Sequence, residues 1–249
     1  MTAQSRLASS DDGPAATLTV GVLALQGGFA EHLSLLRTAA DLVKASTPLA
    51  FEALEVRTPA ELARCDGLII PGGESTTISF VAAQSGLLEP LRDFVKIQKK
   101  PTWGTCAGLI LLSEQANATK KGGQELIGGL GVRVHRNHFG RQIESFEAPL
   151  KLPFLAADDA SAPPPTFPGV FIRAPVVEEV LPGAPVAVLA TLPGRVEMIN
   201  GVSQASTKDA SGDIIAVRQG NVLGTSFHPE LTPDARIHVW WLREILRQR

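Results

Sequence analysis

The first half of the chain alternates between two patterns of hydrophobic and polar residues. A continuous run of aliphatic and β-branched residues covers 17–25, which is typical of a strand buried on both faces of a parallel sheet. Glycines then make a turn, and apolar residues recur at helical spacing at Phe29, Leu33, Leu36 and Ala40. Together these patterns predict a strand, a tight loop and a helix.

The same alternation continues to residue 117. Strand-like runs cover 54–57, 65–73 and 101–105, and helix-like segments cover 59–64, 85–99 and 107–117. Strands that alternate with helices pack as layers joined by right-handed crossovers. The pattern therefore predicts an α/β fold, a three-layer sandwich with a mostly parallel central sheet.

The second half of the chain changes character. Short strand-like segments are separated by loops rich in glycine and proline, and a helix-like segment closes the chain at 234–248. The small and polar residues 1–16 predict a flexible N-terminal tail, and 17–249 is interpreted as a single domain. Segments rich in small, polar and proline residues predict surface insertions near 156–169 and 193–213.

The bulk composition argues against several function classes. Of the 249 residues 44% are hydrophobic, which is enough for one large core, and the formal net charge is -2. The sequence pI of about 6.2 argues against nucleic acid and against anionic membranes as partners. No apolar run approaches the roughly 20 residues that span a bilayer.

The chain has only two cysteines, Cys65 and Cys106. Two are too few for a disulfide framework or a cysteine-based zinc site, and a reducing compartment is therefore favoured. No metal and no cofactor are predicted. Residues 1–17 lack both the apolar core of a signal peptide and the arginine-rich character of a transit peptide. We therefore expect a cytoplasmic protein.

Cys106 is the stronger candidate for chemistry. It lies in GTCAG at 104–108, which matches the sharp turn that presents a nucleophile between a strand and a helix. Such a turn leaves no room for Cβ atoms two residues before and after the nucleophile, and it sets the thiol at the positive end of the next helix, where a thiolate is stabilised. The alternative is a buried cysteine that only fills space, and Cys65 fits that description.

A nucleophilic thiol needs a base and a group that orients the base. His228 follows an apolar strand-like segment, and Glu230 stands two residues later. In extended backbone both side chains lie on one face, so Glu230 is predicted to bond Nδ1 of His228 while Nε2 meets the thiol. Alone, the segment would be interpreted as a strand-end histidine beside an exposed glutamate. Together with the turn at Cys106, a Cys–His–Glu triad is favoured.

Gly72, Gly73 and Glu74 follow another buried strand-like run. Their spacing matches neither of the common phosphate-binding loops, and a glutamate at this place would repel phosphate. A backbone amide that helps to hold an oxyanion, beside a carboxylate that binds an ammonium group, explains the pattern better. The predicted substrate is a zwitterion.

These motifs resemble known families. GTCAG at 104–108, followed by HPE at 228–230, resembles the class I glutamine amidotransferase domain. More narrowly, six segments resemble the glutaminase subunits of pyridoxal 5'-phosphate synthase: LALQGGFAEH, PGGEST, WGTCAGLILL, RNHFGRQIESFE, FIRAP and QGNVLGTSFHPEL. The resemblance runs in order from about residue 18 to about residue 245 and implies a class I glutamine amidotransferase-like fold.

The resemblance implies hydrolysis of L-glutamine to L-glutamate and ammonia. Cys106 would be the nucleophile, His228 the general base and then acid, and Glu230 the group that orients the histidine. The amides of Gly73 and Ala107 would form the oxyanion hole.

The resemblance also implies glutamine-binding positions and a partner. The positions are Gly73, Glu74, Ser75, Arg136, Ile172 and Arg173. An arginine suits this role because its planar guanidinium binds a carboxylate with two hydrogen bonds. The implied partner is a (β/α)₈-barrel synthase subunit, which receives the ammonia, activates the glutaminase and lies near Gln26.

Other histidines receive no functional role from the sequence. His135 stands where the family usually has an acidic residue, and it and His138 are interpreted as surface or loop residues rather than metal ligands. His32 and His238 are interpreted as helix-face residues with no required role.

Three alternatives stay open. An α/β-hydrolase with a cysteine nucleophile would place its acid before the histidine in chain order, whereas Glu230 follows His228. An amidotransferase of another pathway is disfavoured by PGGEST and FIRAP. A regulatory partner of a synthase, without catalysis of its own, would not require all three triad residue types.

Overall fold

The structure, a computed structural model, describes residues 17–117, 124–136, 145–155, 166–193 and 212–249, and the backbone of two short strands at 196–199 and 202–205. The predicted tail at 1–16, His138 and much of the two predicted insertions lie outside the described residues.

The described residues form strands and helices in the following order along the chain. The strands are β1 (Leu18–Leu23), β2 (Phe51–Val56), β3 (Gly67–Ile70), β4 (Thr102–Thr105), β5 (Ser113–Asn117), β6 (Leu130–His135), β7 (Ser145–Leu150), β8 (Phe167–Ile172), β9 (Val176–Val180), β10 (Ala187–Leu192), β11 (Val196–Ile199), β12 (Val202–Ala205), β13 (Asp213–Gln219) and β14 (Val222–Thr225). The α-helices are α1 (Phe29–Lys44), α2 (Pro59–Ala63), α3 (Ser75–Gln84), α4 (Leu88–Arg92), α5 (Ala107–Leu112) and α6 (Arg236–Leu246). A π-helical turn η1 (Asp93–Ile97) extends α4, and η2 (Pro153–Leu155) and η3 (Pro229–Leu231) are 3₁₀ turns.

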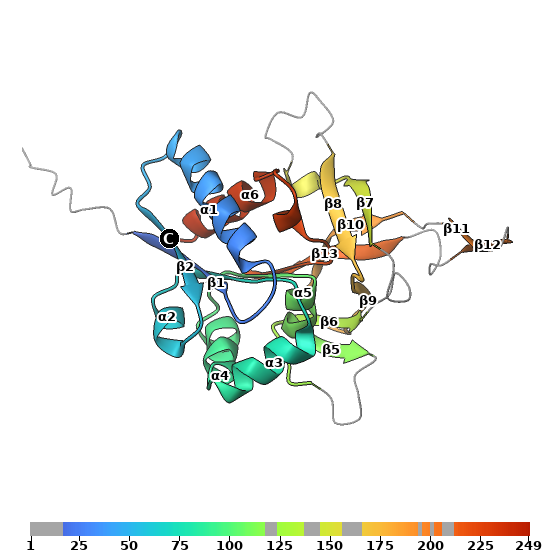
Figure 1. The fold of residues 1–249 in the computed structure, drawn as a ribbon, viewed down its shortest axis with the longest axis horizontal. Helices are drawn as coiled ribbons and strands as arrows, with labels where there is room; N and C mark the ends of the chain where they lie inside the picture. Colours follow the sequence, from blue (N-terminus) through green and yellow to red (C-terminus); the bar gives the residue numbers. More distant parts are fainter. Residues whose placement is uncertain are drawn as a thin grey trace, which may run out of the picture.

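One sheet organises the molecule (Figure 1). Its strands have the order β2-β1-β3-β4-β14-β13-β9-β6-β5, with β10 also paired to β13. The strands from β2 to β14 are mutually parallel, and β5 is parallel to β6, whereas β13 and β9 run antiparallel to their neighbours. The predicted α/β fold with a mostly parallel central sheet is confirmed.

Helices cover both faces of the parallel half. Figure 1 shows α1 and α6 on one side of the sheet, and α2, α3 and α4 on the other. Because successive side chains of a strand point to opposite faces, each strand contributes to two cores. Val20 and Val22 of β1 and Ile69 of β3 pack under α1 and α6, while Leu23 and Ile70 pack on the opposite face.

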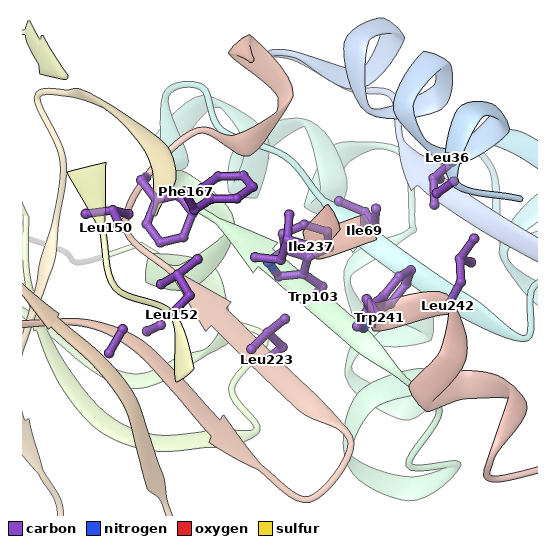
Figure 2. Packing of buried hydrophobic residues seen from close by; sticks show 14 of the residues in the cluster. Leu36, Ile69, Trp103, Leu150, Leu152, Phe167, Leu223, Ile237, Trp241 and Leu242 are labelled. Atoms are coloured by element: carbon purple, nitrogen blue, oxygen red, sulfur yellow. The ribbon is translucent and has the colours of Figure 1, made fainter. Parts of the chain in front are cut away.

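Trp103 lies at the centre of the core under α1 and α6 (Figure 2). The residue is fully buried, and its ring centroid is 5.8 Å from that of Trp241 on α6. Its indole N–H donates to Oγ1 of Thr225 on β14 at 3.0 Å. The strand that leads to Cys106 is therefore anchored to the neighbouring strand β14 and to helix α6.

The predicted helix over 107–117 is wrong in its second half. Helix α5 ends at Leu112, and the next five residues form β5 beside β6. Ser113 turns to extended backbone with ψ of 151°, and its hydroxyl donates to the carbonyl of Ile110 at 2.7 Å. A serine side chain that bonds the backbone competes with helix continuation. Helix α3, which the pattern did not single out, covers Ser75–Gln84.

The described parts of the predicted insertions contain strands. Phe167, which falls in the first insertion, begins β8 and is fully buried. Within the second insertion, β11 and β12 pair as an antiparallel hairpin.

Candidate active site

The carboxyl ends of four neighbouring parallel strands carry the predicted site. Strand β1 leads to the loop at 26–28, β3 to the loop at 72–74, β4 to Cys106 and β14 to His228. Loops at the carboxyl ends of parallel strands are where open α/β sheets bind their ligands.

Cys106 occupies the turn between β4 and α5. Its backbone has φ of 48° and ψ of -101°, a strained conformation for a residue that has a Cβ. The amide of Cys106 donates to the carbonyl of Thr225 on β14 at 2.8 Å and so holds the turn in place. The next amide, of Ala107, belongs to the first turn of a helix and has no acceptor within that helix.

Close packing requires the two glycines of this turn. A Cβ on Gly104 would lie 2.4 Å from the carbonyl carbon of Gly108. A Cβ on Gly108 would lie 2.0 Å from the carbonyl oxygen of Ile70 on β3. Non-bonded atoms do not approach so closely, so a larger residue at either position would displace the turn. The steric reason predicted for the two glycines is confirmed.

His228 and Glu230 meet by a route that differs from the prediction. Strand β14 ends at Thr225, and Pro229–Leu231 forms the 3₁₀ turn η3, so the two residues do not lie in extended backbone. The turn folds the glutamate back, and its Oε1 lies 2.7 Å from Nδ1 of His228. The amide of His228 donates to the carbonyl of Val170 on β8 at 2.8 Å. Pro229 and the hydrogen bond to Val170 together fix the position of His228.

The structure brings Cys106, His228 and Glu230 together. The side chain of Cys106 interacts with the imidazole of His228, and both residues lie against Gly72. Because Nδ1 is bonded to Glu230, Nε2 is the nitrogen that remains for the thiol. The three residues are only 6%, 8% and 5% exposed, respectively, which strengthens the electrostatic interactions among them.

Burial and hydrogen bonds set the charges of the histidine and the glutamate. Burial lowers the pKa of His228, but the hydrogen bonds and charges of Cys106 and Glu230 outweigh it and raise this pKa to about 10. Burial raises the pKa of Glu230, but the interactions with His228 and His32 outweigh it and hold this pKa well below its usual range. At neutral pH the site therefore holds an imidazolium between a carboxylate and the sulfur.

The loop after β3 lies directly against these residues. A Cβ on Gly72 would lie 2.3 Å from Cε1 of His228 and 3.4 Å from the Cβ of Cys106. Only glycine fits there without displacing the imidazole. Gly73 follows with φ of 146°, in the region that favours glycine.

Glu74 caps α3 and lies beside Arg136. Its carboxylate accepts hydrogen bonds from the amides of Thr77 at 2.6 Å and Thr76 at 3.1 Å, and its own amide donates to Oε1 of Gln26 at 2.9 Å. Burial raises the pKa of Glu74, but the bonds from Thr77 and Thr76 outweigh it and lower that pKa. Nη2 of Arg136 lies 3.3 Å from Oε1 of Glu74. An accessible carboxylate beside a guanidinium can bind both charges of a zwitterion.

The other predicted binding positions differ in accessibility. Ser75 is buried, and its hydroxyl donates to Oε1 of Gln124 at 3.1 Å, so it can offer a ligand its backbone but not its hydroxyl. Ile172 and Arg173 are exposed and follow Val170, whose carbonyl holds the histidine turn. Arg173 has φ of 44°. Strained backbone of this kind is concentrated at functional sites.

Two residues beside the triad were missed. His32 of α1 and His238 of α6 are both fully buried, which their interpretation as helix-face residues with no required role did not anticipate. Nε2 of His32 lies 3.3 Å from Oε2 of Glu230, and its Nδ1 lies 3.0 Å from Nε2 of His238. One signal was available, because His32 stands one helical turn before Leu36 on the apolar face of α1.

Two kinds of feature are absent from the part of the chain that the structure describes. Within it, no group of three or more histidine, cysteine, aspartate or glutamate side chains could hold a metal ion. Nor does any helix in it have the length and the apolar character needed to cross a membrane.

Comparison with known proteins gives concordant matches. The model of the SNO glutamine amidotransferase family matches residues 22–247. A probable pyridoxal 5'-phosphate synthase subunit PDX2 of Arabidopsis thaliana is 47% identical over 232 residues, which cover 91% of this chain and 85% of the relative. The pyridoxal 5'-phosphate synthase subunit PdxT of Streptomyces avermitilis is 48% identical over 222 residues, which cover 89% of this chain and 91% of the relative.

Solved structures agree with these sequence matches. A crystal structure of a glutamine amidotransferase has a TM-score of 0.68 and 38% sequence identity, and the match covers 91% of this chain and 98% of that one. The glutaminase domain of Trypanosoma brucei CTPS, with a TM-score of 0.51 and 12% identity, covers 93% of this chain and 94% of its own and shows a shared fold alone.

Proposed function

Because this chain belongs to the SNO glutamine amidotransferase family, we propose that it is the glutaminase subunit of a pyridoxal 5'-phosphate synthase. The reaction is hydrolysis of L-glutamine to L-glutamate and ammonia. The observation that carries the proposal is the contact of Cys106, His228 and Glu230 at the carboxyl edge of the sheet.

The first step is attack by the sulfur of Cys106 on the side-chain amide carbon of glutamine. A carbon–sulfur bond forms, and the carbonyl oxygen becomes an oxyanion. We assign the amides of Gly73 and Ala107 as its hydrogen-bond donors, because the loop at 72–74 and the start of α5 lie on either side of the sulfur. Fixed donors of this kind typically contribute about 10²–10³ in rate.

His228 then acts as acid and base in turn. The imidazolium gives its Nε2 proton to the amide nitrogen, the carbon–nitrogen bond breaks, and ammonia leaves a thioester on Cys106. The neutral imidazole next takes a proton from water as the water oxygen attacks the thioester. Collapse of the second oxyanion breaks the carbon–sulfur bond and restores the thiolate and the imidazolium. The raised pKa of His228 suits this cycle, because the proton is in place before glutamine binds.

The α-amino acid end of glutamine is proposed to lie between two groups of residues. Glu74 would bind the ammonium group and Arg136 the carboxylate, as their 3.3 Å separation allows. Ile172 and Arg173 would close the other side of the site, with the backbone of Ser75 near the substrate. The affinity for glutamine should therefore depend on Arg136 more than on the hydroxyl of Ser75.

The proposed partner is a (β/α)₈-barrel synthase subunit that takes up the ammonia. Two observations support a partner: the matched relatives are described as subunits, and the large hydrophobic residues Ile172 and Leu231 are exposed beside the site. Gln26, whose side chain ties together the loops after β1 and β3, is placed to transmit partner binding to Gly73. A cytoplasmic location stays a prediction from the two free cysteines.

An ammonia assay tests the proposal. Ammonia and glutamate release from glutamine are measured with the protein alone, with a pyridoxal phosphate synthase barrel, and with an unrelated amidotransferase synthase as control. We expect weak activity alone and activation by the first partner only. Activation by the unrelated synthase would assign the protein to another pathway. If glutamine is not turned over with either synthase, the protein would be a regulatory partner without catalysis of its own.

A further inference from the structure

Glu230 has a second carboxylate oxygen that the triad does not use. Oε1 is bonded to His228, whereas Oε2 lies 3.3 Å from Nε2 of His32. Among the described residues, no group forms a hydrogen bond of good geometry with Oε2, and His32 is the polar side chain that lies within 3.3 Å of it. The side chain of Glu230 is 1% exposed, so water does not replace such a partner readily. A buried carboxylate oxygen without a hydrogen-bond donor costs free energy. His32 is therefore the group that can stabilise Oε2 of Glu230.

His32 is itself held by other buried groups. Its Nδ1 lies 3.0 Å from Nε2 of His238, and its Nε2 also lies 3.3 Å from Oγ1 of Thr105. The ring of Trp103 packs edge-on against both imidazoles, with centroid distances of 5.7 Å to His32 and 4.9 Å to His238. The contacting residues lie on α6 and β4, so the position of His32 on α1 is set by two other elements.

The positions of the protons follow from the partners. Nδ1 of His238 has no hydrogen-bond partner among the described residues, and burial lowers the pKa of His238 well below its usual range. A neutral imidazole has one N–H, and buried N–H groups without acceptors are rare, so the proton of His238 lies on Nε2. It donates to Nδ1 of His32. The N–H of His32 is then on Nε2, where it faces the carboxylate of Glu230.

We propose that His32, held in one tautomer by His238, is a positioning residue that donates a hydrogen bond to Oε2 of Glu230 and so aligns Glu230 with His228. The groups that face Glu230 are His228, His32 and the backbone of Gly28, where a Cβ would lie 3.0 Å from Oε1. The inference rests on the proposed function, because it extends the catalytic triad by two residues.

Two substitutions at one position separate a hydrogen bond from packing. His32→Leu removes the donor, and His32→Gln keeps an N–H near the place of Nε2. In His32→Leu the carboxylate loses its donor and its alignment, His228 holds its proton less firmly, and the thiolate is less stabilised. Alkylation of Cys106 near pH 6.5 should therefore become about 10-fold slower.

The first measurement is the rate of iodoacetamide alkylation of Cys106 between pH 5 and 9, with the modified cysteine identified by peptide mass. The second measurement is kcat and KM for glutamine in the presence of the activating partner. We expect kcat of His32→Leu to fall about 10-fold with KM within about twofold, because His32 does not touch the substrate positions. His32→Gln should stay within about threefold of the unchanged protein in both measurements. Val43→Ala, a buried change at the far end of α1, is the control for lost stability and should not move the pH profile.

Equal pH profiles for His32→Leu and the unchanged protein would overturn the inference alone. Equal shifts in the leucine and glutamine variants would overturn it as well, because packing would then explain the effect. If His32→Leu does not fold, His238→Leu and His238→Gln provide the same contrast one residue further from Glu230. A Cys106 that reacts no faster than Cys65 in the unchanged protein would overturn the proposed function and this inference with it.

Discussion

The two cysteines lie at opposite ends of neighbouring strands, and their surroundings differ accordingly. Cys65 lies just before β3, is fully buried, and its thiol donates to the carbonyl of Glu61 at 3.4 Å. Burial raises the pKa of Cys65 to about 11. Cys106 follows β4, has strained backbone and contacts His228. Both thiols are hidden from bulk water, so burial by itself does not make a cysteine inert or reactive.

The comparison shows what the carboxyl edge of the sheet supplies. Here the chain leaves each strand through a tight loop, and side chains from distant loops, such as Cys106 and His228, can converge on one point. At the amino edge near Cys65 the neighbours are mainly apolar, and the nearby cation Lys100 donates to the backbone carbonyl of Cys65 rather than to the sulfur. Burial therefore disfavours the thiolate of Cys65, whereas Cys106 has an imidazole beside its sulfur.

Removal of the reactive sulfur should have the largest effect. Cys106→Ala deletes the nucleophile but leaves the turn and its two glycines unchanged, so we expect glutamate release to fall by at least about 10³-fold with the protein still folded. The measurement is turnover of glutamine with the activating partner, with circular dichroism as the check of folding. Full turnover in a folded Cys106→Ala protein would contradict the role of this residue.

Removal of the base should have the next largest effect. His228→Asn keeps a polar group but loses the proton transfer at Nε2, and the expected loss in kcat is about 10² or more. The pH–rate profile should also lose the limb that reports the histidine. A variant with a normal profile would show that another group moves the proton.

Loss of the carboxylate should change the pH dependence more than the maximal rate. Glu230 raises the pKa of His228, so Glu230→Gln should lower that pKa from about 10 and move the alkaline limb of kcat/KM to lower pH. The same raised pKa stabilises the fold fully below the ordinary histidine value of 6.5, and this stabilisation is lost as the pH rises through about 10. Urea denaturation at pH 6 and pH 10 measures this contribution to the free energy of unfolding, which should be smaller in Glu230→Gln. An unmoved alkaline limb would argue that Glu230 does not act through His228.

The smallest effect on activity should come from the other cysteine. Cys65→Ala removes a buried sulfur far from the site, so kcat and KM should stay unchanged while the free energy of unfolding falls by about 1 kcal/mol. Urea denaturation and the ammonia assay measure the two quantities side by side. A loss of turnover in folded Cys65→Ala would break the contrast between the two edges.

Much of the fold and of the candidate site could be predicted because its signals are local. The spacing of Gly104 and Gly108 around Cys106 reflects a clash within a single turn, and the apolar runs reflect strands covered on both faces. The end of α5 at Leu112 could not be predicted in this way. It depends on Ser113 and on pairing of the following residues with β6, which is distant in the sequence.

The sequence by itself determined the alternation of strands and helices in the first half of the chain, except for α3 and β5, as well as the candidate nucleophilic turn and the family to which the chain belongs. These features rest on spacing within short segments, which side-chain geometry restricts directly. Only the tertiary structure decided how His228 and Glu230 meet, through a 3₁₀ turn, and that His32 and His238 lie buried behind them. The helical pattern of α1 and α6 is the same whether a histidine faces water or a carboxylate. The difference arises only when the two helices pack on one face of the sheet, beside the end of β14.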